Sequence, residues 1–113
     1  MSRRKEVAAR YGFEPITCPE HEKVGVSRDV GTGVMPIHGM RLRPENGTAG
    51  WYLWAGEDMS DEPDFFEPLH VSHLQERCPE VLPFLELPPG WRFLLAPGHE
   101  DVWHDPDVDL SPA

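Results

Sequence analysis

Two pairs of side chains in this sequence have the types and spacing of metal ligands. His70 and His73 are separated by two residues, and Cys18 and His21 offer a thiolate and an imidazole at the same spacing. A convincing zinc site combines such pairs in a doubled arrangement with characteristic distances between them. Neither pair occurs in that arrangement. We therefore expect His70 and His73 on the exposed face of a short helix, and Cys18 as a small buried residue.

A third candidate is the acidic repeat formed by Asp105, Asp107 and Asp109, which matches the first three ligand positions of a calcium-binding EF-hand loop. Such a loop requires glycine at its sixth position and glutamate at its twelfth. The sixth position here is Leu110, and the sequence ends before the twelfth. We expect a solvated acidic tail and no calcium site.

Acidic residues are so numerous that a catalytic pair cannot be identified from sequence proximity. A carboxyl group acts as a general acid or base when burial or a neighbouring charge shifts its pKa, whereas acids between prolines in a loop are expected to be solvated. The sequence contains no Gly-x-Ser-x-Gly elbow, no phosphate-binding loop and no glycine-rich dinucleotide turn. We expect neither catalysis nor a cofactor. A metal protein or enzyme using His70 and His73 is an alternative.

The aromatic run Trp51-Tyr52-Leu53-Trp54 has the residue types of a base-stacking platform. Such platforms lie in positively charged grooves, but this run leads directly into Glu57 and Asp58. The alternation along the run is typical of a strand with one or both faces buried, and we interpret it as core.

The acidic charge is concentrated in one half of the chain. The 113 residues carry a net charge of −10, and residues 57–113 contain fourteen acids against two arginines. Such a field repels nucleic acid and anionic membranes and attracts basic partners. The alternative is that the acidity serves only solubility.

Length, apolar content and cysteine use indicate a small soluble protein. A chain of 113 residues is close to the usual size of one domain, and no apolar run approaches the ~20 residues that cross a bilayer. The basic N-terminus is followed by no apolar stretch of the secretory type. We therefore expect a cytoplasmic location, with Cys18 and Cys78 as reduced thiols.

The elements that must position these side chains are short. The first half predicts a helix over residues 2–11, a connector over 13–23 and a strand over 24–30. It then predicts an edge-like or bulged strand over 34–43, a loop over 44–50 and a central strand over 51–54. Edge or bulge character is expected for the strand over 34–43 because it contains Pro36 and Gly39.

The second half predicts a surface loop over 56–68, because six acids and two prolines cannot bury themselves. A strand leading into a short helix follows over 69–77, then a helical stretch over 79–87, and strands over 91–96 and 101–104. Helices and strands are segregated, which favours an α+β fold: a mostly antiparallel sheet of four to six short strands with two or three short helices.

Several short motifs resemble the immunity protein 33 family of bacterial domains. They are Val26-Ser-Arg-Asp-Val30, Gly39-Met40-x-x-Arg43, Gly50-Trp51, the acidic run Gly56-Glu57-Asp58-x-x-Asp61-Glu62, Pro79-x-x-Leu82-x-x-Leu85 and Pro88-x-Gly90-x-x-Phe93. The glycine-tryptophan pair followed by the acidic run is the most specific part. The sequence departs from the family at Pro63, where an aromatic residue is common, and at Trp91 and Arg92, where small residues are usual.

The resemblance implies a small α+β domain, often encoded beside polymorphic toxins, that neutralises a cognate toxin by binding it and has no catalytic residues. We expect a single domain over residues 1–113, with an N-terminal helix and connector over 1–23, an immunity-like core over 24–104 and an acidic tail over 105–113.

The predicted partner is a protein, a basic toxin domain, and not nucleic acid or a membrane. The predicted binding residues are acids of the 56–68 loop with two aromatic anchors: Glu57, Asp58, Asp61, Glu62, Asp64, Phe65 and Phe66. The alternative is an acidic accessory or structural domain without a toxin partner.

Overall fold

A computed structural model of the chain describes residues 3–44, 47–56, 62 and 64–108. Within these ranges, six strands form one sheet in the order β4-β1-β3-β2-β5-β6. Their bounds are β1 Lys23–Ser27, β2 Ile37–Arg41, β3 Thr48–Ala55, β4 Phe66–His70, β5 Trp91–Ala96 and β6 His99–His104. Neighbouring strands are antiparallel except β1 and β3, which are parallel. The predicted α+β class with a mostly antiparallel sheet is confirmed.

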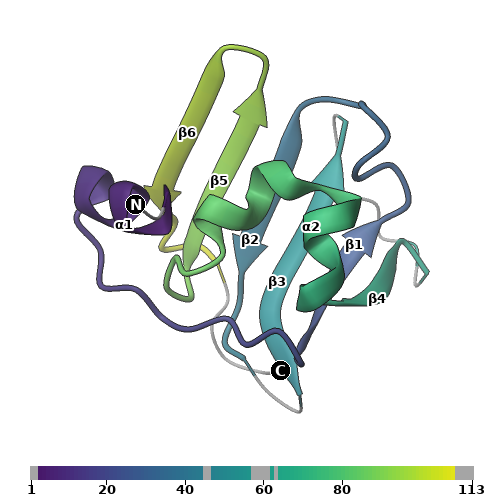
Figure 1. The fold of residues 1–113 in the computed structure, drawn as a ribbon, viewed down its shortest axis with the longest axis horizontal. Helices are drawn as coiled ribbons and strands as arrows, with labels where there is room; N and C mark the ends of the chain where they lie inside the picture. The colour runs from purple at the N-terminus through teal and green to yellow at the C-terminus, as the bar shows by residue number, and fades with distance from the viewer. Residues whose placement is uncertain (1–2, 45–46, 57–61, 63, 109–113) are drawn as a thin grey trace.

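The helical elements lie against one face of the sheet (Figure 1). They are α1 Arg3–Tyr11, the 3-10 helix η1 Val71–His73, α2 Leu74–Arg77 and the 3-10 helix η2 Pro79–Phe84. The core between the two layers includes Val7, Trp51, Leu53, Leu74, Phe84 and Phe93, each at most 2 % exposed. No helix in the described part of the chain is long and apolar enough to cross a membrane.

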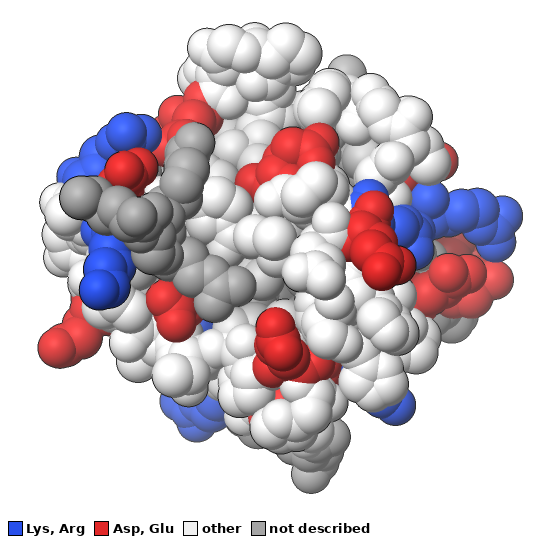
Figure 2. Space-filling model, in the orientation of Figure 1, with Lys and Arg blue, Asp and Glu red and all other residues white. Residues whose placement is uncertain are grey.

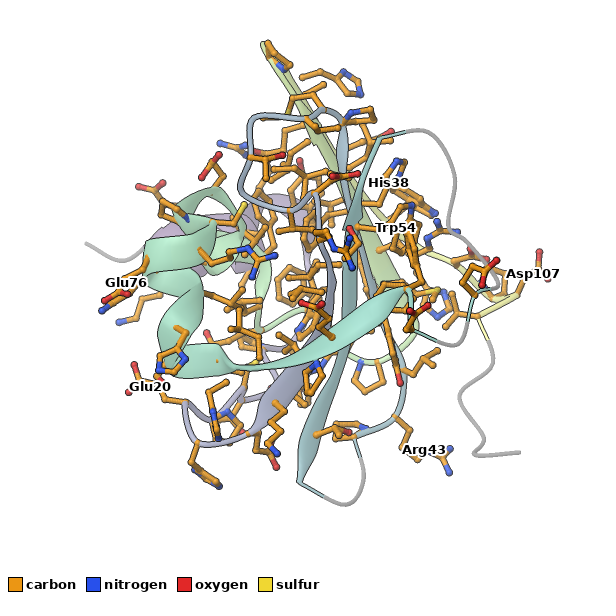
Figure 3. All side chains as sticks on the ribbon, turned by 90° about the vertical axis from the view of Figure 1, so that its right-hand side faces the viewer. Glu20, His38, Arg43, Trp54, Glu76 and Asp107 are labelled. Carbon is orange, nitrogen blue, oxygen red and sulfur yellow. The ribbon has the colours of Figure 1, made fainter. Side chains whose placement is uncertain are left out.

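Strand β3 lies inside the sheet, as predicted for the aromatic run, and its side chains alternate between the two faces. Trp51 and Leu53 belong to the core beneath the helices. Trp54 points to the opposite side of the sheet from Glu76 of α2 (Figure 3). Trp54 is nevertheless only 4 % exposed, so both faces of this strand bury aromatic surface.

Strand β2 is not an edge strand, which corrects the expectation drawn from Pro36 and Gly39. It is hydrogen-bonded to β3 on one side and to β5 on the other. Pro36 precedes the first residue of the strand and therefore removes no donor from the ladder. Gly39 fits the interior because a Cβ there would lie 2.1 Å from the ring of Phe93. The glycine marks a close ring contact rather than a bulge.

In two places a strand begins before the predicted loop ends. β3 begins at Thr48, within the predicted 44–50 loop, and β4 begins at Phe66, within the predicted 56–68 loop. Gly50 sits in β3 with φ 88°, and a Cβ at this position would lie 2.1 Å from the carbonyl oxygen of Leu42. Phe66 pairs with Ser27 of β1, and its ring contacts the ring of Tyr52. Local turn signals could not show these long-range contacts.

A buried arginine joins the two layers. Arg41, at the end of β2, is 0 % exposed. Its guanidinium donates hydrogen bonds to the carbonyl oxygens of Ala49, Ile16, Thr17, Leu85 and Leu87, at 2.8–3.2 Å. These bonds fix the connector after α1 and the segment that follows η2 on the sheet. Burial lowers the pKa of Arg41 from its ordinary value, and the surrounding carbonyl dipoles replace the water that the cation has lost.

Candidate protein-binding surface

The structure describes four of the seven predicted binding residues. Glu57, Asp58 and Asp61 lie outside the described residues. Glu62, Asp64, Phe65 and Phe66 are described and lead directly into β4, an edge strand of the sheet. The backbone N–H of Phe65 donates to the carbonyl oxygen of Glu62, which forms a turn at the entry to the strand.

The two predicted aromatic anchors have different surroundings. Phe66 is half-buried and packs edge-on against Tyr52 and Trp54, with ring centroids 5.1 and 6.3 Å away. Phe65 contacts the ring of Phe66 at 4.9 Å and is also half-buried. Phe66 therefore belongs to an aromatic cluster of the sheet, while Phe65 stands at its margin.

Phe65 is part of the wall of a pocket with a volume of about 320 Å³, called here the acidic pocket. The turn before β4 and the start of that strand contribute one side, and the end of β1 with the residues after it contributes the other. The lining residues are Ser27, Arg28, Asp29, Glu62, Asp64, Phe65 and Glu67. Four carboxylates thus surround the pocket with one guanidinium, at the right-hand edge of Figure 2, where acidic and basic side chains meet beside β1 and β4.

Arg77 of α2 fixes the β1 side of the acidic pocket. Its Nε donates to the carbonyl oxygen of Val30 at 2.7 Å, and its NH2 group donates to those of Ser27 and Arg28 at 3.3 Å. Gly31 follows with φ 88°, where a Cβ would lie 2.1 Å from the carbonyl oxygen of Arg77. The backbone that carries Ser27 and Asp29 is therefore held from both sides by one residue of the helical layer.

The acids at the opposite edge of the sheet are engaged inside the chain. Glu100 of β6 accepts hydrogen bonds from Arg10 at 2.9 Å and from the Tyr11 hydroxyl at 2.8 Å. Asp105 pairs with Arg92 at 3.1 Å and accepts a bond from the backbone N–H of Asp107 at 2.9 Å. The hydrogen bond from the Asp107 N–H lowers the pKa of the Asp105 carboxyl most, and the bond from Arg92 lowers it further. The expectation that Asp105 is part of a merely solvated tail was therefore wrong.

Arg92 also organises the face of the sheet away from the helices. Its guanidinium lies 5.9 Å from the ring centre of Trp54 and 5.3 Å from that of Trp103. His38 stacks on Trp54 at 4.9 Å, and its Nε2 lies 2.8 Å from the carbonyl oxygen of Gly56 (Figure 3). With Trp54 buried between these partners, this face does not present it as a platform for nucleic-acid bases.

The candidate metal ligands do not converge. The rings of His70 and His73 are 5.8 Å apart, at the ends of β4 and η1, and both residues are exposed. Among the residues that the structure describes, no group of three or more histidines, cysteines or acids is placed to hold a metal ion. Asp105 and Asp107 form a turn, and Asp109 lies outside the described residues.

Cys18 and Cys78 are both buried, and neither takes part in a disulfide. Cys78 is 0 % exposed, and burial raises the pKa of its thiol to about 11. A thiol with so high a pKa is almost entirely protonated near neutral pH and is a poor nucleophile or metal ligand.

A second hollow, called here the apolar groove, has a volume of about 760 Å³ and lies between η2, the start of β2 and the β5–β6 hairpin. Met35, which is 37 % exposed, contributes to its wall with Ile37, Phe84 and Leu95. Glu80, His99 and Glu100 supply its polar positions.

Comparison with protein families gives one match. The family model described as the Imm33-like domain matches residues 3–105, which is nearly the whole chain. The chain belongs to the Imm33-like domain family. No curated protein and no solved structure matches it significantly.

Membership identifies an immunity-type protein and confirms the family resemblance read from the short motifs. The match begins within α1, so the N-terminal helix is part of the Imm33-like domain. The short family motifs include Arg43, which is exposed, but not Arg41, which is buried. Ser27 and Asp29 belong to one of the quoted motifs, but they were not predicted as binding residues, and neither was Glu67. Only the fold brings the first two beside the start of β4, because β1 and β4 pair antiparallel across 38 intervening residues.

Proposed function

We propose that this Imm33-like protein neutralises a cognate toxin by binding a basic surface of the toxin through the acidic edge of its sheet. The acidic edge is the acidic pocket, and the proposed contact also includes Glu57, Asp58 and Asp61, which lie outside the described residues. Binding would block the toxin without any catalytic step by the chain itself. Family membership supports a protein partner. The gathering of four carboxylates around one pocket supports this edge as the contact.

Charge placement supports the acidic edge over the other acids of the chain. Asp29, Asp64 and Glu67 form no ion pair with any described residue, whereas Glu100 and Asp105 do. Unpaired acids around a pocket leave their field available to a partner and accelerate encounter with a basic surface. Phe65, at the pocket wall, adds apolar area that a partner can cover. For a nuclease toxin, the acids would stand in for nucleic-acid phosphates.

The test is the association rate between this protein and the toxin domain encoded beside it. Asp58→Asn, Asp61→Asn and Glu62→Gln together should slow association about 10-fold at low salt and flatten its salt dependence. The matched control replaces Glu100 and Asp105 by Gln and Asn, and it should leave the rate near that of the wild type. Unchanged kinetics in the first variant would exclude this interface.

Three alternatives have separate tests. Toxin binding that survives loss of the acids but is abolished by Met35→Glu would place the contact at the apolar groove. A gene neighbourhood without any toxin would favour an accessory or structural domain whose acidity serves solubility. Elemental analysis of protein purified without a metal-affinity tag tests the metal alternative at His70 and His73, which predicts a stoichiometric metal.

A further inference from the structure

One residue that lines the acidic pocket, Ser27, has a buried hydroxyl without a partner among the described residues. Ser27 is 3 % exposed, and its Oγ has no hydrogen-bond partner in the described part of the chain. A serine hydroxyl provides one donor and two acceptor lone pairs, and buried hydroxyls are normally bonded. The unused Oγ lies in the one residue of β1 that lines the pocket. This observation is independent of the acidity and points to a polar group supplied from outside.

The charged side chains that line the pocket with Ser27 indicate the charge of the group that would bind there. Asp29, Asp64 and Glu67 line the same pocket and form no ion pair with a described residue. Arg28 is the opposing charge in the lining, and its side chain is exposed. A cation entering the pocket gains from the excess of carboxylates, and an anion is repelled.

The shape and composition of the wall favour a planar cation. A guanidinium presents five N–H donors in a rigid fork, so it can donate to a hydroxyl and to carboxylates at the same time. Its flat face also stacks on aromatic rings, and Phe65 provides a half-buried ring in the wall. A lysine ammonium has three donors around a point and lacks the planar face. A volume of about 320 Å³ leaves space for one side chain and little more.

We propose that the acidic pocket binds the guanidinium of one arginine of the partner protein, with Ser27 Oγ as the inner acceptor and the carboxylates at the mouth. This inference rests on the proposed function, because it names the side chain that the acidic edge receives. Arg77 makes the pocket rigid by holding the carbonyl oxygens of Ser27, Arg28 and Val30. A preformed wall lowers the ordering cost of binding.

The direct test uses N-acetyl-arginine amide as the probe and the full ¹⁵N-labelled chain, followed by NMR. We expect saturable shifts confined to the backbone amides of residues 27–29, 62 and 64–67, with a Kd of about 1–10 mM, because the probe offers only one side chain. N-acetyl-lysine amide should bind at least about 5-fold more weakly. Shifts that do not saturate, shifts spread over the surface, or equal binding of the lysine probe would each overturn the proposal.

Three single variants separate the pocket from general acidity. Ser27→Ala removes the inner acceptor without a change of charge and should weaken the arginine probe about 3- to 10-fold. Arg28→Ala removes the competing cation and should strengthen it. Ser72→Ala, an exposed serine of η1, is the matched control and should change nothing. A Ser27→Ala protein that is folded by its NMR spectrum and binds the probe unchanged contradicts the role of the hydroxyl.

The same variants distinguish failure of this inference from failure of the proposed function. If the wild type binds its toxin and Ser27→Ala and Glu67→Gln bind it equally well, the arginine pocket is wrong while the immunity role stands. If the wild type does not bind the toxin, the proposed function is wrong, and the pocket loses the partner from which its arginine was inferred.

Discussion

The two edge strands of the sheet both carry acids, but the surroundings of these acids differ. Along β6 and just beyond it, Glu100 pairs with Arg10 and Asp105 pairs with Arg92. Around the start of β4, Asp64 and Glu67 form no ion pair with a described residue, although Arg28 lines the same pocket, and the Ser27 hydroxyl has no hydrogen-bond partner among the described residues. Two equally acidic segments of the sequence can therefore have different roles. An acid with an internal partner serves the fold, and an acid left without one is available to another molecule.

The number of partners that a charged side chain has inside the protein should therefore determine how much it contributes to the free energy of unfolding. Among the described residues, Arg41 is the cation with the most internal partners, five carbonyl acceptors, and it has no exposure. Arg92 follows, then the half-exposed Arg10 with Glu100, and last the pocket acids Asp29, Asp64 and Glu67. Variants along this series test whether the loss of stability follows the same order.

The largest loss of stability is expected for Arg41→Met. It removes the donors to carbonyl oxygens on three segments and should lower the free energy of unfolding by about 3–5 kcal/mol, a large share of the ~5–15 kcal/mol typical of a domain. Arg43→Ala, two residues away and exposed, should change it by no more than about 0.5 kcal/mol. Urea denaturation followed by tryptophan fluorescence measures both. Equal effects would mean that the carbonyl cage is energetically unimportant.

A smaller loss is expected for Arg92→Ala, about 1–2 kcal/mol, because the variant removes a partly buried ion pair and the cation between Trp54 and Trp103. Thermal or urea unfolding at pH 7 tests the size. Stability equal to the wild type would remove Arg92 from the group of structural charges.

The pH dependence follows from the lowered pKa of Asp105. Its contribution to stability is fully present above the unfolded pKa of about 4 and is lost as pH falls through the lower folded pKa. The stability difference between wild type and Asp105→Asn should therefore shrink between pH 4 and about pH 2. A difference that stays constant across this range would show that the carboxylate charge is not involved.

Glu100→Gln should cost at most about 1 kcal/mol, because Arg10 is 56 % exposed and the amide oxygen of glutamine can still accept the Tyr11 hydroxyl bond. The effect should diminish in 0.5 M salt, since exposed ion pairs are screened. Unfolding curves at two salt concentrations measure this, and a salt-independent loss would indicate a packing contribution instead.

The smallest effect on stability is expected at the acidic pocket. Asp64→Asn with Glu67→Gln should leave the free energy of unfolding within about 0.5 kcal/mol of the wild type, or raise it slightly as repulsion between carboxylates is relieved. Urea midpoints measured beside those of Glu100→Gln provide the comparison. A loss as large as that of Arg92→Ala would show that these acids also serve the fold.

Much of the fold could be predicted from the sequence because its signals are local. Alternation in the aromatic run indicated an interior strand, and the helix formers before Gly12 indicated α1. The position of β2 could not be predicted, since Gly39 looks like a strand breaker until the ring of Phe93 is placed against it. The same holds for Arg41, whose acceptors come from segments as far as 46 residues away.

The candidate site was predictable only in part for the same reason. The acids before β4 are contiguous in the sequence, so composition located Glu62 and Asp64 and suggested Phe65 as an anchor. Ser27 and Asp29 belong to another strand and the turn after it, and only the pairing of β1 with β4 brings them to the same pocket. Whether an acid is paired with an internal arginine likewise depends on contacts across the fold, such as Arg10 with Glu100.

The assignment of the β4 edge to the partner is tested by the association rate of the cognate toxin with two variants. One variant neutralises the unpaired acids Asp29, Asp64 and Glu67, and the other neutralises the paired acids Glu100 and Asp105. Stopped-flow measurements between about 50 and 500 mM salt should show the first variant slowed about 10-fold at low salt, with a flattened salt dependence. The second should associate at nearly the wild-type rate. The opposite order, or equal rates in both, would contradict the assignment of the β4 edge to the partner.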